Sequence, residues 1–519
     1  MTRLKLLLGM LALTALMIAL VVCFSPYAPA VEPAGDIEEI WAIEDAREES
    51  EAPLVTRLEN HGMRLGYDAQ ENTFYCPIGL NTGDEWPELH LTAPGAKDVK
   101  LVFVDDYTYD WCSDALRDGY AYQIMAYTDT QFSYAQMVFT GLPVVRIEAE
   151  EALTYDDAIA QVTMASPEGG LHTRAIAHLR GAGSRLSEKK SYRIDFVHGQ
   201  KNSSAIAEVP GVGQADNIIL LAGVMDPSLM RDRLSWDVYA MIAGEDEPYG
   251  PRKTQYVELF VGDSYTGVYV MMEPVDDGEE LQKRGVNAPM TDSVYRSAQI
   301  DYAGDRAYVE NTMREGSIYE LYHAPDSAHA FDALAAYLEM ERLPEGEVYD
   351  EEFERLAMKH IDLESILRYY LFVQGGGMSD NVYNNMYILA QRENGKTVYR
   401  FAPWDMDLTW GRFKNGDGDF YHDLFSFEVA QRMIDIDAGG VTREMLAGLW
   451  REMRAGAMNE ETIAALVDGY TYELDASGAY VRDAMRWRDD AYTADGYEIT
   501  SFTDEHFAVL DELFAAYAP

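Results

Sequence analysis

The chain has 519 residues, of which 41 are Lys or Arg and 89 are Asp or Glu, so its formal net charge is −48. A hydrophobic content of 48% can build a folded core and excludes a disordered acidic tail. The charge disfavours a nucleic-acid surface, which needs clustered basic residues, and it disfavours docking on anionic lipid. The length predicts about two to four domains.

Residues 1–30 have the pattern of a targeting segment. Arg3 and Lys5 precede an apolar run over 6–24, and small residues at 28–30 are typical of a signal-peptide cleavage site. The run is also long enough to cross a bilayer, so an uncleaved signal anchor is the alternative. Both interpretations predict an exported body that contacts the membrane only through this segment.

Two regions precede the main body of the chain. Residues 31–57 are acidic and predict a linker that becomes helical over 36–51. Short strand-like segments, turns and many tyrosines over 58–142 predict a small β-rich domain. Its Cys76 and Cys112 predict one disulfide in an oxidising compartment, with two buried thiols as the alternative.

Residues 143–519 read as a larger mixed body, so the expected fold class is α/β (α+β). Helical periodicity covers 331–370 and 442–487, and Asp226 with Pro227 predicts the start of another helix. Strand patterns occur at 144–147, 175–179, 191–196, 217–221, 257–261 and 267–272.

The usual nucleotide and metallohydrolase motifs, GxxxxGK[ST] and HExxH, are missing. A glycine-containing segment, Arg180-Gly181-Ala182-Gly183-Ser184, follows a predicted strand and precedes Lys189-Lys190. Glycines let backbone N–H groups approach an anion closely, and a basic residue neutralises phosphate. A structural turn is the alternative interpretation of this segment.

Asp380 and Asn385 have the D-x4-N spacing of a kinase catalytic loop. In such a loop the Asp accepts the proton of the substrate hydroxyl and the Asn binds a metal ion. The alternative is an Asp that caps a helix, followed by surface amides.

Asp405 and Asp407 lie two residues apart between Trp404 and Trp410. In a strand, both carboxylates would project to one face and repel each other unless a cation lay between them. This spacing predicts a divalent metal site, with an exposed acidic turn as the alternative.

The order of these elements resembles the CotH kinase family, the atypical kinases of the spore-coat type. The resemblance extends over roughly residues 143–490, and the ordered set is more specific than any single motif. The matching segments are 180–184, 189–194, 217–221, 225–231, 257–261, 265–273, 380–387 and 403–408.

The resemblance implies a strongly diverged protein-kinase-like fold that uses ATP and Mg²⁺ or Mn²⁺ to phosphorylate Ser or Thr of proteins. The implied roles are catalytic base for Asp380, phosphate-binding catalytic lysine for Lys190, metal ligands for Asp405, Asn385 and Asp407, and nucleotide contacts for Arg180, Gly181, Gly183, Ser184, Lys190 and Glu273. Glu273 is either a rim residue or a partner for Lys190. The stretch 375–377 is three glycines where the family has apolar residues, which predicts a mobile loop.

The resulting hypothesis is an exported kinase, at the cell surface or in a spore coat, whose protein substrates are coat or surface proteins. One alternative is a non-catalytic coat scaffold, although a scaffold has no need to concentrate like charges. Another alternative is an adhesion module that binds through the Tyr-rich region at 58–142.

Overall fold

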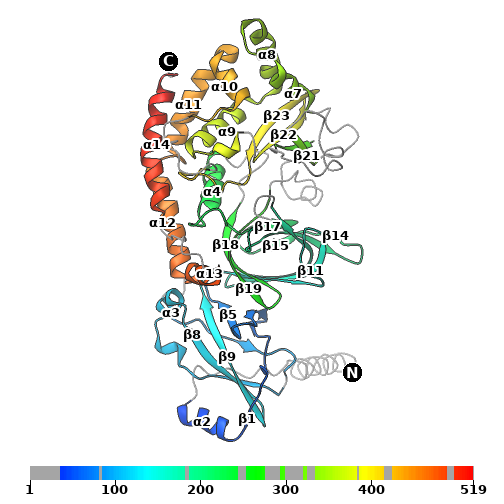
Figure 1. Cartoon of the computed structure of the whole chain (residues 1–519), viewed down its shortest axis with the longest axis vertical. Coiled ribbons are helices and arrows are strands. Elements are labelled where there is room, and N and C mark those ends of the chain that lie inside the picture. Colours follow the sequence, from blue (N-terminus) through cyan, green and yellow to red (C-terminus); the bar gives the residue numbers. More distant parts are fainter. Residues whose placement is uncertain are drawn as a thin grey trace, which may run out of the picture.

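The computed structural model describes residues 36–80, 85–96, 98–181, 186–243, 253–274, 293–297, 319–323, 334–382, 385–413, 424–487 and 496–517. An N-terminal sheet, a β-barrel and a helical part follow one another along the long axis (Figure 1). The predicted targeting segment at 1–30 lies outside the described residues. None of the helices in the described ranges combines the length and apolarity that crossing a membrane requires.

The N-terminal part is a sheet with the strand order β4-β5-β9-β8-β7, and it confirms the expected β-rich region. Its core is built from aromatic and aliphatic side chains that include Leu58, Phe74, Phe103, Tyr122 and Phe139. The elements are β1 (Glu48–Glu49), β2 (Glu59–Asn60), β3 (Met63–Arg64), β4 (Gly66–Asp68), β5 (Thr73–Pro77), β6 (Leu91–Thr92), β7 (Lys100–Phe103), the 3-10 helix η2 (Tyr107–Tyr109), α3 (Cys112–Asp118), β8 (Ala121–Tyr127) and β9 (Gln131–Thr140).

The acidic segment before this sheet forms the predicted helix, but it packs on the sheet instead of acting as a linker. Asp36 caps α2 (Ile37–Asp45) by accepting the backbone N–H of Glu38. Ile40 and Ile43 then bury one helix face in a small core against strands β7 to β9. Strand β1 follows and pairs in parallel with β9. Hydrophobic burial therefore ties residues 36–49 to the sheet.

The disulfide expected between Cys76 and Cys112 is absent. Cys76 lies in β5 and Cys112 begins α3, and both are fully buried thiols. Burial raises the pKa of Cys76 to about 12. A buried thiol that stays protonated is a poor nucleophile.

We therefore expect iodoacetamide to leave Cys76 and Cys112 unmodified in the native chain. Both should be alkylated after unfolding in guanidinium without any reductant, because neither is held in a disulfide. Peptide mass spectrometry measures both states. Protection that persists in guanidinium and is lost on adding dithiothreitol would contradict the structure.

Seven strands of the middle part close into a barrel. The pairing runs β10-β11-β12-β13-β17-β19-β18, and β18 returns to β10 as the one parallel pair of this ring. The barrel strands are β10 (Val144–Ala149), β11 (Ala158–Ser166), β12 (Gly169–Arg180), β13 (Ser191–His198), β17 (Asn217–Leu221), β18 (Thr254–Val261) and β19 (Ser264–Met272). Three short strands flank them, namely β14 (Ser203–Ser204), β15 (Ala207–Val209) and β16 (Gly213–Ala215).

Side chains from every barrel strand fill its interior, as the alternation of apolar residues requires. In β13, Tyr192, Ile194 and Phe196 are buried while Arg193 and Asp195 are partly exposed, which confirms the predicted face. The interior cluster includes Val145, Ile147, Val162, Ala177, Ile194, Leu220, Leu259 and Met271. This packed core makes the barrel a rigid support for the loops at its rim.

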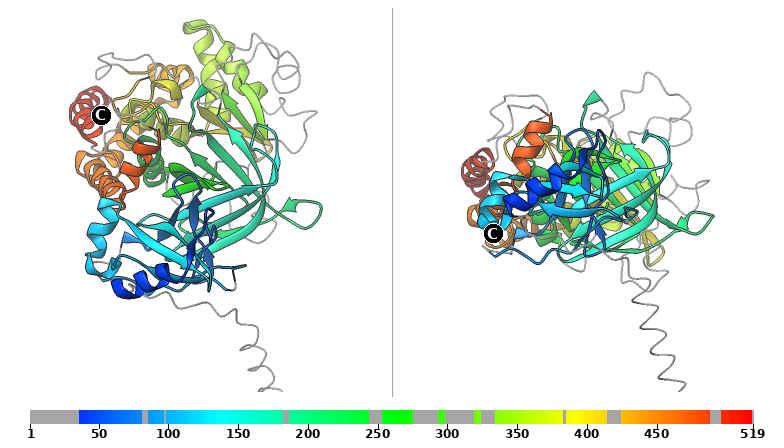
Figure 2. Two further views of the ribbon diagram at one scale, coloured as in Figure 1. Left: turned by 60° about the horizontal axis from the view of Figure 1, so that its bottom comes forward. Right: turned by 90° about the horizontal axis from the view of Figure 1, so that it is seen from below.

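The helical part packs against the barrel, and its C-terminal helices lie along one side of it in both views of Figure 2. The helices are α4 (Arg231–Ala243), α7 (Ala335–Arg342), α8 (Glu347–His360), α9 (Leu363–Gly375), α10 (Glu428–Asp435), α11 (Thr442–Ala455), α12 (Glu460–Ala476), α13 (Ala479–Trp487) and α14 (Tyr497–Ala515), with the 3-10 helices η5 (Ser379–Asn381) and η7 (Ala438–Gly440). A second sheet, of order β21-β20-β22-β23, comprises β20 (Ser293–Ser297), β21 (Tyr319–His323), β22 (Met386–Glu393) and β23 (Lys396–Pro403).

The fold is thus mixed α/β with a helical C-terminal part, in agreement with the expected class. One predicted boundary is wrong. Helix α4 begins at Arg231, not at Pro227, because residues 226–230 form a turn in which Leu229 has a φ of +60°. Asp226 still contacts the first residue of α4, since its Oδ2 accepts the backbone N–H of Arg231 at 2.7 Å.

Candidate active site

The segment after β23 carries Asp405 and Asp407, but it is not a strand as the sequence suggested. Strand β23 ends at Pro403, and Asp405 adopts a left-handed φ of +54°. Alternation along a strand therefore does not set the directions of these two side chains. They remain electrostatic neighbours, because Asp405 helps to raise the pKa of Asp407.

The structure brings the two polar residues of the D-x4-N segment into contact. Asp380 lies in η5 after helix α9, and the Nδ2 of Asn385 donates to its Oδ2 at 3.1 Å. The same Nδ2 lies 3.4 Å from the backbone oxygen of Asp405. Asp380 is not the N-cap of η5, a position that Met378 holds. The amide of Asn385 thus lies between the two carboxylate-bearing segments.

Asn381, which the sequence analysis overlooked, joins these segments. This buried amide donates from Nδ2 to the backbone oxygens of Asn385 and Trp404, at 2.9 and 2.8 Å. Trp404 N–H in turn donates to Asn385 O, and Tyr369 O–H donates to Asn381 O. The two bonds from Asn381 Nδ2 and the bond between Trp404 and Asn385 hold the two loops together.

Helix α4 holds the other side of the Asp405 segment. Asp232, 6% exposed, accepts the backbone N–H of Met406 through Oδ1 at 2.9 Å. Arg231 donates from Nε to the backbone oxygen of Thr409 at 2.9 Å. The side chain of Arg231, 1% exposed, also forms an ion pair with Asp226 at 2.6 Å.

Carboxylates are concentrated around this segment, and their raised pKa values show that burial and mutual repulsion disfavour the charged forms. Burial, followed by the charge of Asp405, raises the pKa of Asp232 to about 7. The pKa of Asp407 lies well above its usual value because of burial and the charges of Asp405, Asp232, Asp226 and Asp380, in that order. The site therefore has an excess of negative charge that a cation would relieve.

A basic side chain approaches the same site from the barrel. Arg180 ends β12 and its guanidinium lies 4.5 Å from the centre of the Trp404 ring. Its charge also lowers the pKa of Asp232 and partly offsets the neighbouring carboxylates. Arg180 therefore lies beside the Asp405 segment.

The remaining predicted nucleotide residues are placed only in part. Gly181 follows β12 with a φ of +101°, a conformation that favours glycine. Gly183 and Ser184 lie outside the described residues. Lys190 is half-buried, whereas Lys189 is fully buried and forms an ion pair with Asp483 of α13 at 2.8 Å.

Glu273 and Lys190 each lie at the end of a barrel strand. Glu273 follows Met272, the last residue of β19, and Lys190 precedes Ser191, the first residue of β13. The assignment of Glu273 as a rim residue or as a partner for Lys190 therefore stays a prediction.

The three glycines at the end of α9 pack against neighbouring side chains, so the expectation of a mobile loop is wrong. Residues 375–377 are all buried. A Cβ at Gly375 would lie 2.3 Å from Met458 Cε, and one at Gly377 would lie 2.6 Å from Phe502 Cζ. Gly377 also has a φ of +63°. The glycines let α9 end against neighbouring helices and direct the chain toward Asp380.

The donor chemistry of the site fits a hard divalent cation. Asp405, Asp407 and Asn385 provide carboxylate and amide oxygens, which Mg²⁺ and Mn²⁺ prefer. Within the described ranges, no three His, Cys, Asp or Glu side chains are grouped closely enough to enclose an ion. The site thus has the charge and the atoms for a cation, and the described side chains do not form a closed cage.

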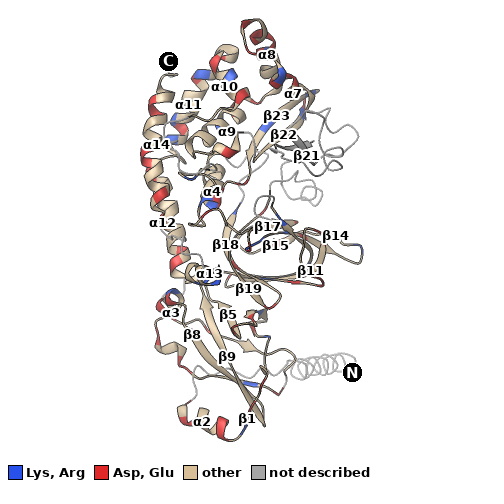
Figure 3. Cartoon of the chain, in the orientation of Figure 1, with Lys and Arg blue, Asp and Glu red and all other residues tan. Residues whose placement is uncertain are grey.

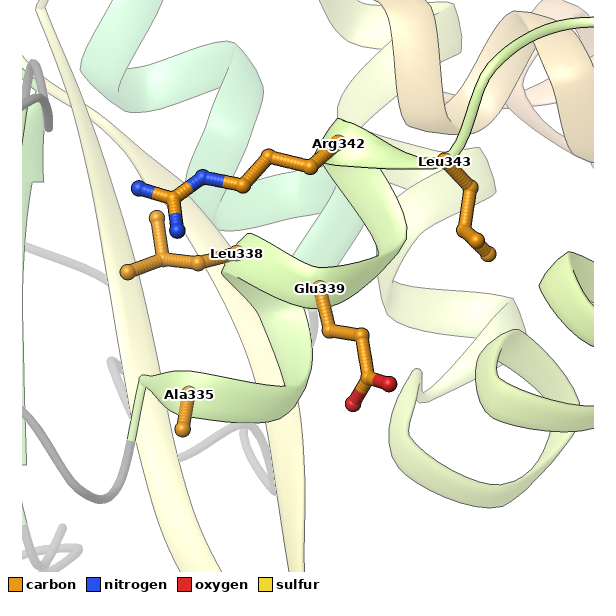
Figure 4. A pocket seen from close by; sticks show the side chains of 5 residues that line it. All are labelled: Ala335, Leu338, Glu339, Arg342 and Leu343. Atoms are coloured by element: carbon orange, nitrogen blue, oxygen red, sulfur yellow. The ribbon is translucent and has the colours of Figure 1, made fainter.

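Two other features lie outside this site. Acidic residues occur on α2, α8, α12 and α14, so the large negative charge is spread over the molecule (Figure 3). A pocket of about 310 Å³ is lined by residues of α7 and the residue after it (Figure 4). None of its lining residues was predicted as a site residue: Ala335, Leu338, Glu339, Arg342 and Leu343.

Comparison with known proteins matches a family model, CotH kinase protein, over residues 177–509. The chain belongs to the CotH kinase protein family. This CotH match includes the glycine segment, the Asp380 loop and the Asp405 segment. The inner spore coat protein H of Bacillus subtilis (strain 168) is 25% identical over 239 residues, or 46% of this chain. The aligned region spans 59% of that relative's length.

Proposed function

We propose that this CotH-family chain is an exported protein kinase that transfers the γ-phosphoryl group of ATP to Ser or Thr of surface or coat proteins. The carrying observation is the hydrogen bond between Asn385 and Asp380 beside the Asp405 segment. A base, an amide and additional carboxylates in one place are what phosphoryl transfer requires. The family match supports the same reaction class.

In this mechanism Asp380 orients the substrate hydroxyl and accepts its proton. The hydroxyl oxygen forms a bond to the γ-phosphorus, and the bond from that phosphorus to the bridging oxygen of ADP breaks. Arg180 and Lys190 provide positive charge for the phosphates. Asp405, Asn385 and Asp407 would hold Mg²⁺ or Mn²⁺, which neutralises phosphate charge when bound.

The location and the substrate class are part of this proposal. The relative in Bacillus subtilis is named as a spore coat protein, and residues 1–30 of this chain have the pattern of a signal peptide or anchor. Both observations support a site of action at the cell surface or in a coat. Neighbouring surface or coat proteins are the proposed substrates.

The test is phosphoryl transfer by the purified full chain, using γ-labelled ATP with Mg²⁺ or Mn²⁺ and a mixture of acceptor proteins. We expect metal-dependent labelling of Ser or Thr that falls about 10²- to 10⁴-fold in Asp380→Asn, because the base is lost. Asp468→Asn is the matched control, since it makes the same change on the exposed face of α12.

Two results would contradict the kinase. One is equal labelling by wild type and Asp380→Asn, which would remove the base from the mechanism. The other is an absence of both labelling and metal-dependent ATP binding in the wild type. The second result would favour the non-catalytic coat scaffold.

A further inference from the structure

The first turn of α4 and the Asp405 segment meet through a small set of buried contacts. Asp232 is the second residue of α4, and its Oδ1 accepts the N–H of Met406 at 2.9 Å. Both residues are buried, at 6% and 0% exposure. A backbone donor at this depth needs an acceptor, and the carboxylate provides a charge-assisted one.

This hydrogen bond lies directly beside a strained residue. Asp405 has a φ of +54°, a left-handed conformation that is uncommon for residues other than glycine. Such a conformation persists only where the neighbouring structure determines it. The residue before it is fixed by the Trp404 N–H bond to Asn385 O at 2.8 Å, and the residue after it by Asp232.

The other α4 contacts hold a later part of the same segment. Arg231 Nε donates to Thr409 O, and Ser235 accepts from Trp410 Nε1 at 2.8 Å. Asp232 is therefore the α4 side chain placed to set the backbone between Asp405 and Asp407. Its carboxylate also adds negative charge next to Asp405. An aspartate at this position therefore increases the electrostatic repulsion in the site.

We propose that Asp232 is a positioning residue, which fixes the conformation of Asp405 by accepting the Met406 N–H. This inference rests on the proposed function, because Asp405 is the metal-binding carboxylate there. It differs from a role for Asp232 as a metal ligand. An asparagine keeps an acceptor oxygen and removes the charge, so it separates the two roles.

The experiment compares Asp232→Asn and Asp232→Leu in the full chain, with Asp237→Leu as the matched control. Asp237 lies on the same helix and accepts from Thr254 and Tyr470, away from the Asp405 segment. The readouts are the Mg²⁺ concentration for half-maximal phosphoryl transfer, kcat, the melting temperature, and hydrogen exchange of the peptide that contains 404–410.

We expect Asp232→Leu to raise the Mg²⁺ requirement about 10- to 100-fold, by analogy with the loss of other groups that orient metal ligands. Exchange of the 404–410 peptide should become faster. Asp232→Asn should behave like the wild type in both readouts. Asp237→Leu should lower the melting temperature and leave the Mg²⁺ requirement unchanged.

A rise in the Mg²⁺ requirement of Asp232→Asn that equals the rise in Asp232→Leu would overturn the proposal and favour a charge or ligand role. Unchanged exchange in Asp232→Leu would also overturn it. If Asp232→Leu does not fold, slow exchange of 404–410 in both wild type and Asp232→Asn supports the proposal, and fast exchange in Asp232→Asn contradicts it. If the wild type transfers no phosphate, the proposed kinase fails and the exchange comparison still decides the positioning role.

Discussion

Replacing Arg231 by methionine is expected to destabilise the folded chain by about 3–5 kcal/mol, the usual cost of breaking a buried ion pair. Asp226 is 2% exposed and would lose its cationic partner, which lies 2.6 Å away. The change would also leave the backbone oxygen of Thr409 without the donor Arg231 Nε. Asp226 would keep only the hydrogen bonds from Ser228 and from the backbone N–H of Arg231, which do not neutralise its buried charge.

Urea unfolding, followed by circular dichroism, measures this effect. Arg117→Met is the matched control, because Arg117 pairs with Asp114 and Asp118 on the exposed face of α3 and should tolerate the change. A double variant, Arg231→Met with Asp226→Leu, should recover much of the lost stability, since no unpaired charge remains. An unfolding midpoint for Arg231→Met that equals the wild type would contradict the buried pair.

Replacing Asp405 by asparagine is expected to lower phosphoryl transfer about 10²- to 10³-fold while increasing the stability of the fold. The proposed kinase loses activity because the change removes the charge of a carboxylate that is proposed to bind the metal ion. Stability rises because Asp405 repels Asp232 and Asp407, whose pKa values it raises. Asparagine also adopts the left-handed conformation readily.

Kinetic assays and thermal unfolding, both without and with Mg²⁺, measure the two halves of this prediction. Asp437→Asn is the control for conformation, because Asp437 also has a left-handed φ, of +51°, and accepts the N–H of Arg443. A stability gain larger in Asp405→Asn than in this control reports the relief of like-charge repulsion. Retained activity, or a loss of stability in the metal-free protein, would contradict the assigned role of Asp405.

Much of the barrel could be predicted as strands, whereas its closure could not. The segments at 191–196 and 217–221 alternate or run apolar, and both are strands in the structure. Closure depends on the parallel pairing of Val144–Ile147 with Glu258–Val261. No turn or periodic pattern in the sequence signals a pairing across more than a hundred residues.

The candidate site, too, could be predicted from the sequence only in part. Asp380 and Asn385 lie within hydrogen-bond distance, because residues five positions apart in one loop stay close, whereas their roles in phosphoryl transfer stay predictions. Asp232 was missed although the matching segment at 225–231 ends one residue before it. Its proposed role depends on a contact with Met406, which lies 174 residues later in the sequence, and no local pattern reveals such a contact.

The glycines at 375–377 show how composition can mislead. Glycine is conformationally permissive, so three in sequence suggest motion. Here a Cβ at Gly377 would overlap the ring of Phe502, and a Cβ at Gly375 or Gly376 would displace the end of Met458 or Met378. Close packing and a positive φ at Gly377 explain the residues without any mobility.

The ring closure of the barrel also constrains the order of events while the chain is being synthesised. Strands β10 to β13 emerge first, and their ring stays open until β18 and β19 follow. Pairings this distant in sequence form slowly, and open strand edges invite association with other chains until they close. The Lys189–Asp483 pair spans 294 residues and can form only after α13 has emerged. A newly made chain should therefore pass through a vulnerable interval, and chaperones would have their greatest effect before residue 483 is available.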